Sequence, residues 1–222
     1  MSAPTAMREA VAAASRHLAA AGLVHRTSGN VSARCGEAIA VTPTGGVLSE
    51  LQAEDIVLVD AAGSVVEGSS APTSEIGLHL GIYDAYDAGA VVHTHAPAAT
   101  AVSCVFEELP AIHYEMLGLG GAIRVAPYTT FGTPELAASA VAALAGRTAA
   151  LLANHGTITY GADLESAVRA TELLEWVAEL YARAVAIGTP KVLDEKALQD
   201  VVDALAARGY GALRPATGQE AE

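Results

Sequence analysis

The fold is decided by Ala90-Val91-Val92-His93-Thr94-His95-Ala96-Pro97, an apolar run that ends in two histidines. The run predicts a buried strand, on which residues two apart point to the same face. His93 and His95 therefore aim their imidazoles at one region, about 7 Å apart along the backbone at ~3.3 Å per residue. Pro97 ends the strand because it has no N–H to donate. The pair is either half of a metal site or two ordinary polar residues at a strand end.

The other half of such a site is present elsewhere in the chain. Residues 148–156 run from a second apolar strand into His155, and Gly156 lets the backbone approach whatever that histidine faces. Glu75 stands at the start of a helix predicted over about 74–89, which leads directly into the first strand. Its carboxylate either favours the helix dipole or acts as a general base or metal ligand. Three histidines and a glutamate suit zinc.

Several other classes of site fit less well. The chain has no HExxH motif, and residues 96–101 hold no glutamate, which argues against zincin and cupin sites. An amidohydrolase barrel normally needs a longer chain with its histidine pair near the N-terminus. Lys191 and Lys196 are the only lysines; the first falls between the last two predicted helices and the second near the start of the last one, so a Schiff-base aldolase would lack its buried lysine. Carbonyl chemistry here would have to be metal-assisted.

Composition narrows the class of protein further. The 222 residues predict one α/β domain over residues 1–209 and a mobile tail over 210–222. With 12 basic and 25 acidic residues the net charge is −13, so we expect no nucleic-acid or anionic-membrane partner. Cys35 and Cys104 form no CxxC motif and indicate free thiols in the cytoplasm. No signal peptide or membrane span is expected.

Hydrophobic periodicity and turn residues predict the remaining elements. We expect helices at about 5–21, 74–89, 98–105, 134–144, 164–186 and 193–208, and strands at 39–42, 56–60, 64–66, 90–95, 123–128 and 148–155. Residues 27–34 are interpreted as a turn.

Three polar segments could contribute to a site, and two of them could bind an anion. Gly29-Asn30 permits a tight turn with the Asn30 amide directed inward. The loop 43–46 offers a hydroxyl and flexible N–H groups, and Thr73 or Ser74 would cap the helix that carries Glu75. The alternative in each case is a plain turn or cap.

Together these stretches resemble the class II aldolase/adducin family, specifically its zinc-dependent L-fuculose-1-phosphate aldolase branch. The matching stretches are Gly29-Asn30-Val31-Ser32, Thr42-Pro43-Thr44-Gly45, Pro72-Thr73-Ser74-Glu75, Val91-Val92-His93-Thr94-His95, Ile112-His113-Tyr114, Ala126-Pro127-Tyr128 with Phe131-Gly132-Thr133, and Asn154-His155-Gly156. They span most of residues 10 to 185.

The resemblance implies a three-layer α/β fold, in which helices cover a central, mainly antiparallel sheet. It implies a C4 homotetramer with active sites between subunits. One Zn²⁺ per chain, replaceable by Mn²⁺ or Co²⁺, would be held by His93, His95 and His155. Glu75 would be the fourth ligand of the empty site and also the acid/base.

The resemblance also implies roles for further residues. The phosphate would be held by Asn30, Thr44, Gly45, Thr73 and Ser74. Tyr114, reaching in from a neighbouring subunit, would protonate the aldehyde oxygen. The tail Tyr210-Gly211-Ala212-Leu213-Arg214 is similar to the family's Tyr-Gly-Leu-Arg with one residue added, which leaves a contribution of Tyr210 open.

The implied reaction is reversible cleavage of a ketose 1-phosphate, either L-fuculose 1-phosphate or a related 5-deoxypentulose 1-phosphate, to dihydroxyacetone phosphate and an aldehyde. Sister lyases of the same fold are alternatives: methylthioribulose-1-phosphate dehydratases, tetronate-phosphate decarboxylases and ribulose-5-phosphate 4-epimerases, the last tending to carry aspartate in place of Glu75. A non-catalytic adducin-like scaffold is a further alternative, but such proteins lose the metal ligands that this chain keeps.

Overall fold

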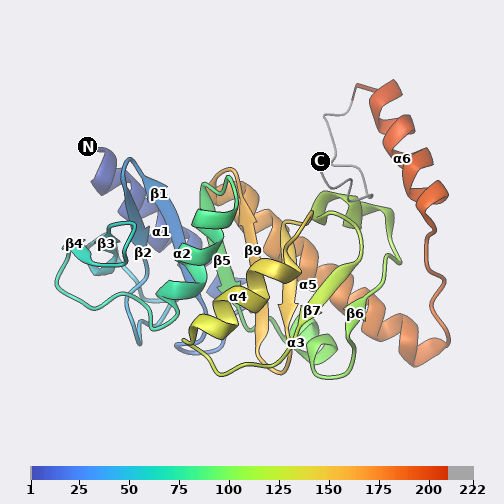
Figure 1. Ribbon diagram of the computed structural model, residues 1–222, viewed down its shortest axis with the longest axis horizontal. Coiled ribbons are helices and arrows are strands. Elements are labelled where there is room, and N and C mark those ends of the chain that lie inside the picture. Colours follow the sequence, from blue (N-terminus) through green and yellow to red (C-terminus); the bar gives the residue numbers. More distant parts are fainter. Residues whose placement is uncertain (1, 210–222) are drawn as a thin grey trace.

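The computed structural model describes residues 2–209, and within them a nine-stranded sheet forms the centre of the molecule (Figure 1). The strands are β1 (Asn30–Cys35), β2 (Ala38–Val41), β3 (Val57–Val59), β4 (Val65–Glu67), β5 (Ala90–Thr94), β6 (Glu108–Leu109), β7 (Ile123–Ala126), β8 (Ala149–Leu152) and β9 (Gly156–Gly161). Their order is β4-β3-β2-β1-β5-β9-β8-β7-β6. Only the β7–β8 pair of this sheet is parallel, which confirms the predicted mainly antiparallel arrangement.

Helices cover both faces of the sheet. They are α1 (Ala3–Ala20), α2 (Ile76–Ala85), α3 (Pro97–Ser103), α4 (Pro134–Ala143), α5 (Leu164–Ile187) and α6 (Glu195–Ala207), with short 3₁₀ turns η1 (Ala53–Asp55) and η2 (Tyr114–Leu119). Helices α1, α3 and α5 pack on one face, and α2 and α4 pack together on the other. Each face of the sheet therefore has its own hydrophobic core, and strand β5 contributes to both: Val92 packs on the α1, α3 and α5 side and Val91 on the α2 and α4 side. Helix α6 lies outside these layers and contacts η2 (Figure 1).

Two strands at the centre of the sheet differ from the sequence prediction. Residues 27–34 were predicted as a turn, but β1 begins at Asn30 and pairs with both β2 and β5. The predicted strand 148–155 ends at Leu152, and His155 lies in the turn of a β8–β9 hairpin. Asn154 takes φ 55° in that turn, a left-handed conformation that asparagine tolerates better than most residues.

The helix that carries Glu75 is also shorter than predicted. Helix α2 begins at Ile76 and ends at Ala85, with Glu75 itself at the N-cap. Neither Thr73 nor Ser74 is therefore the cap residue. The Glu75 N–H instead donates to Thr73 Oγ1 at 3.3 Å. The side chain of Glu75 makes no capping hydrogen bond to the helix backbone, which leaves its carboxylate available to the sheet.

Two further expectations from the sequence concern membrane spans and cysteines. No helix within residues 2–209 combines the length and apolar character that crossing a membrane requires. Cys35 and Cys104 are both free thiols, as expected.

The connection between α2 and β5 has no room for a side chain at Gly89. A Cβ there would lie 1.9 Å from the carbonyl oxygen of Ala162. We expect Gly89→Ala to lower the free energy of unfolding by about 1–3 kcal/mol, the usual range for overpacked sites. Gly77→Ala is the matched control, because a Cβ at Gly77 in α2 would meet open space. Alanine is the better helix former there and should raise stability by roughly 0.5–1 kcal/mol.

Denaturant unfolding of the two variants beside the wild type measures both effects. If Gly89→Ala is as stable as Gly77→Ala, the backbone at residue 89 does not approach Ala162 as closely as the structure has it.

Candidate active site

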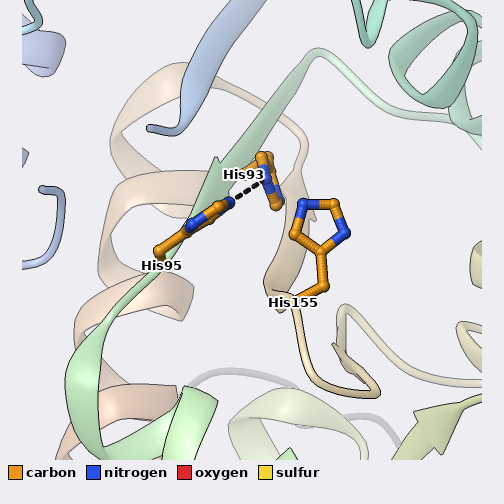
Figure 2. A group of neighbouring side chains, drawn as sticks. All are labelled: His93, His95 and His155. Carbon is orange, nitrogen blue, oxygen red and sulfur yellow. Dashed lines mark hydrogen bonds between the residues drawn. The ribbon is translucent and has the colours of Figure 1, made fainter. Parts of the chain in front are cut away.

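Three imidazoles converge at the end of the central strands (Figure 2). His93 lies on β5, His95 directly follows it, and His155 projects from the β8–β9 turn. One ring nitrogen from each lies within 4.8 Å of the others. The Nε2 atoms of His93 and His95 are 3.1 Å apart. The pair predicted from the sequence and the separate third histidine therefore form one cluster.

Glu75 approaches this cluster from the start of α2. Its Oε2 lies 3.2 Å from His93 Nε2, and its Oε1 lies 3.4 Å from His155 Nε2. Asn30, which is directly opposite His93 in the β1–β5 register, donates from Nδ2 to Glu75 Oε2 at 3.0 Å. Opposite residues on neighbouring strands share a face, so this register delivers Asn30 to the same point as His93.

Burial determines the protonation of these groups. Desolvation lowers the pKa of His93 to about 4, although the Glu75 carboxylate opposes that shift. Desolvation also lowers the pKa of His95 and of His155. For Glu75, burial by itself raises the pKa, but the imidazoles of His93 and His155 and the Asn30 hydrogen bond outweigh it, and the net pKa falls below the ordinary value. At neutral pH the site therefore contains neutral imidazoles and a carboxylate.

This donor set fits a divalent metal ion. His93 Nδ1 lies 2.7 Å from the carbonyl oxygen of Thr157 and must donate to it, so the His93 Nε2 lone pair points into the cluster. Such a carbonyl contact is the usual way of orienting a ligating histidine. Glu75 Oε1 is buried and accepts no hydrogen bond from the described residues. A buried carboxylate oxygen without a donor is costly, and a cation at the cluster would compensate it.

A cavity of about 260 Å³ opens beside the cluster. Its wall includes the predicted metal-site residues Glu75, His95 and His155. It also includes all five residues that the resemblance implies for phosphate: Asn30, Thr44, Gly45, Thr73 and Ser74. The structure thus brings these two predicted groups together in one cavity.

Tyr114, a further predicted site residue, does not reach this cavity from its own chain. Tyr114 begins η2, is 48% exposed and stacks on His113 with ring centroids 4.6 Å apart. It does not line the described cavity. Tyr210 and the rest of the predicted tail, 210–222, lie outside the described residues.

The cavity wall also contains residues to which the sequence alone assigned no role. Tyr128 and Phe131 are both 65% exposed and lie in the loop between β7 and α4. Asn154 contributes from the hairpin turn. Exposed aromatic residues in a loop rich in threonine and glycine are the signal that could have identified the first two.

Comparison with known proteins decides the family. The family model for the class II aldolase and adducin N-terminal domain matches residues 9–182. The chain belongs to this family. A Rhodospirillum rubrum 5-methylthioribulose-1-phosphate/5-deoxyribulose-1-phosphate aldolase is 38% identical over 212 residues, covering 95% of this chain and 96% of the relative. An Escherichia coli K12 L-fuculose phosphate aldolase is 40% identical over 185 residues, covering 82% of this chain and 86% of the relative.

The fold agrees with this assignment. A solved structure of an L-fuculose 1-phosphate aldolase superposes with a TM-score of 0.85 at 36% identity, covering 90% of this chain and 96% of that one. The chain is therefore a class II aldolase, an enzyme of the lyase class, as the sequence motifs predicted. Class II aldolases depend on a metal, and the histidine cluster is where this one could bind it.

The cluster predicts metal content directly. Purified protein should retain about one divalent ion per chain after dialysis, and His95→Ala should lose most of it because only two imidazoles remain. His17→Ala is the matched control, since His17 is an exposed residue of α1 that pairs with Glu172 and belongs neither to the cluster nor to the cavity wall. Elemental analysis of the three proteins checks this, and full metal occupancy in His95→Ala would refute the assigned ligands.

Proposed function

We propose that this class II aldolase is zinc-dependent and cleaves a ketose 1-phosphate reversibly to dihydroxyacetone phosphate and an aldehyde. The observation that carries the proposal is the shared cavity, which joins the histidine–glutamate cluster to a wall of hydroxyl and amide groups. A 5-deoxypentulose 1-phosphate is the favoured substrate, because the relative named for such sugars matches 95% of this chain. L-fuculose 1-phosphate is the other member of the proposed class.

The metal ligands in this proposal are His93, His95 and His155, with Glu75 as the fourth before substrate arrives. Three nitrogen ligands and a replaceable fourth position suit zinc, although Mn²⁺ or Co²⁺ could substitute. When bound, the ion supplies positive charge that stabilises the oxyanion developing on the substrate.

Glu75 is the proposed acid/base. Its Oε2 is oriented by the Asn30 amide, and its low pKa keeps it ionised and able to accept a proton from the substrate. The same group returns that proton in the reverse direction. Because Glu75 stands at the N-cap with no helix contact of its side chain, it can move without breaking α2.

The phosphate would be bound by neutral groups: Asn30, Thr44, Gly45, Thr73 and Ser74. Among the described residues that line the cavity, none is lysine or arginine. Thr73 Oγ1 accepts the Glu75 N–H, which leaves its own O–H free to donate. Asn30 Nδ2 has two hydrogens and gives one to Glu75, so the other can reach the phosphate. Oriented N–H and O–H dipoles bind phosphate well without a cationic side chain.

A proton donor for the aldehyde oxygen would come from a neighbouring subunit. The Tyr114 ring stacks on His113, and His113 in turn contacts Trp176 edge-on at 4.9 Å, so the phenol is held at the surface and away from its own cavity. A C4 ring in which each chain lends Tyr114 to the next would complete every site. A cytoplasmic location is part of the proposal and suits the two free thiols.

The reaction is tested by a coupled assay for dihydroxyacetone phosphate release from a panel of ketose 1-phosphates, with and without a chelator. We expect release that the chelator abolishes and zinc restores. Glu75→Gln is nearly isosteric but cannot take up a proton, so it should keep the phosphate site while losing about 10²–10⁴-fold in turnover. Loss of water or inversion at a carbon, without dihydroxyacetone phosphate, would identify a sister lyase instead.

The intersubunit role is tested by mixing two inactive proteins, Tyr114→Phe and Glu75→Gln, under conditions of subunit exchange. Some sites in mixed rings would combine an intact Glu75 with an intact Tyr114 of the next chain. Activity should return to no more than about a quarter of wild type for random mixing in a closed ring. If mixed rings form and activity stays at the level of the separate mutants, Tyr114 does not act across the interface.

A further inference from the structure

A line of buried polar side chains runs from Glu75 away from the cavity into the protein. Asn30 Nδ2 donates to Glu75 Oε2 at 3.0 Å, and Asn30 Oδ1 lies 2.5 Å from His79 Nε2. Ser32 Oγ is 2.7 Å from His79 Nδ1 and 2.8 Å from the Tyr83 hydroxyl. None of the five residues is more than 7% exposed, and His79 is completely buried.

The line results from matching two periodicities. Glu75, His79 and Tyr83 are spaced by four residues at the start of and along α2, so they share one face of the helix. Asn30 and Ser32 are spaced by two on β1 and share one face of the sheet. The strand residues fit between the helix residues, so every hydrogen bond in the line joins a residue of β1 to Glu75 or to a residue of α2.

The chemistry of Glu75 gives the line a single direction. An ionised carboxylate only accepts hydrogen bonds, so the Asn30 NH₂ faces it and the Asn30 oxygen faces His79. His79 Nε2 must then carry a proton and donate it to that oxygen, which leaves Nδ1 as the acceptor for the Ser32 O–H. Ser32 Oγ in turn accepts from the Tyr83 O–H. Every donor in the line points toward Glu75.

The protonation of His79 agrees with this direction. Complete burial lowers its pKa to about 3, so the ring is neutral throughout the working pH range of a cell. A neutral ring has one donor and one acceptor nitrogen, which is the arrangement that Asn30 and Ser32 require.

We propose that His79 is a positioning residue that acts through Asn30 to hold the Glu75 carboxylate in its productive orientation. This inference rests on the proposed function of Glu75. Without His79, the Asn30 oxygen loses its donor and the amide is free to rotate. Glu75 Oε2 then loses the one hydrogen bond that the described residues give its side chain. Misplacement of a reacting group by about 1 Å can cost ~10²-fold in rate.

Two substitutions at His79 separate positioning from packing. In His79→Gln the amide can still donate to Asn30 and accept from Ser32, whereas His79→Leu can do neither. We expect His79→Leu to lower kcat about 10–100-fold with KM and zinc content nearly unchanged, and His79→Gln to recover kcat to within about threefold of wild type. Thr171→Val is the matched control, because it removes the buried hydrogen bond between the hydroxyl groups of Thr171 and Thr159, which lies on the opposite face of the sheet. It should lower Tm but leave kcat alone.

A double-mutant cycle with Asn30 shows whether the effect passes through that residue. In an Asn30→Ala background, His79→Leu should cause no further loss of kcat, since the intermediary is already gone. Additive losses in a folded double mutant would overturn the proposal. Wild-type kcat in a folded His79→Leu protein would also overturn it. If His79→Leu does not fold, His79→Met, which also lacks a donor for Asn30, is the substitute variant, and wild-type kcat there has the same meaning.

A ¹⁵N NMR spectrum of His79 distinguishes failure of this inference from failure of the proposed function. The Nε2–H tautomer should persist from about pH 5 to 8, and Ser32→Ala should shift the Nδ1 signal. If wild type cleaves no ketose 1-phosphate but this tautomer is found, the proposed function fails and the hydrogen-bonded line stands. The opposite tautomer, in an enzyme that is active, overturns the inference alone.

Discussion

The rest of this structure depends on one constraint: the lone pairs of His93 Nε2 and of the Glu75 carboxylate converge at one buried point. His93 is completely buried and must use its Nδ1 proton on Thr157, so its Nε2 faces the Glu75 carboxylate without a proton of its own. Burial weakens the screening of their repulsion, and the carboxylate oxygen Oε1 has no hydrogen-bond donor among the described residues. A cation at this point would remove that cost, so metal binding and folding would favour one another.

The scaffold around this point is made of rigid elements. An antiparallel register fixes Asn30 opposite His93, and a tight hairpin fixes His155. Helix α2 then presents Glu75 at its N-cap, where the side chain makes no hydrogen bond to the helix backbone. Sites built on strands and helices hold their groups more precisely than sites built on long loops. The loop that carries Tyr128 and Phe131 also lines the cavity, and it is the less rigid part of the wall.

The acidic composition of the chain and the absence of lysine and arginine from the described cavity wall have the same consequence for ligand binding. A net charge of −13 disfavours the approach of phosphorylated ligands, and salt screens that repulsion beyond about 10 Å. In the proposed function, phosphate binding would therefore depend on short-range dipoles in the cavity. Hydroxyl and amide donors around Thr44 and Thr73 can meet a phosphate without a lysine, whose charge beside the histidines would weaken metal binding.

The sequence by itself determined the family, the mixed helix and strand content, and the histidines that are candidates for the metal site. Periodicity and motifs are local properties of the chain and can be read without the fold. Helices such as α5, predicted over 164–186, are found at Leu164–Ile187. Only the tertiary structure decided that Asn30 lies on a central strand and that Gly156 opens another. Both strands bury polar residues, Ser32 and Thr157 among them, so they lack the alternation that marks a half-buried strand. Their polar groups are satisfied only by segments distant in sequence, which no local pattern can reveal.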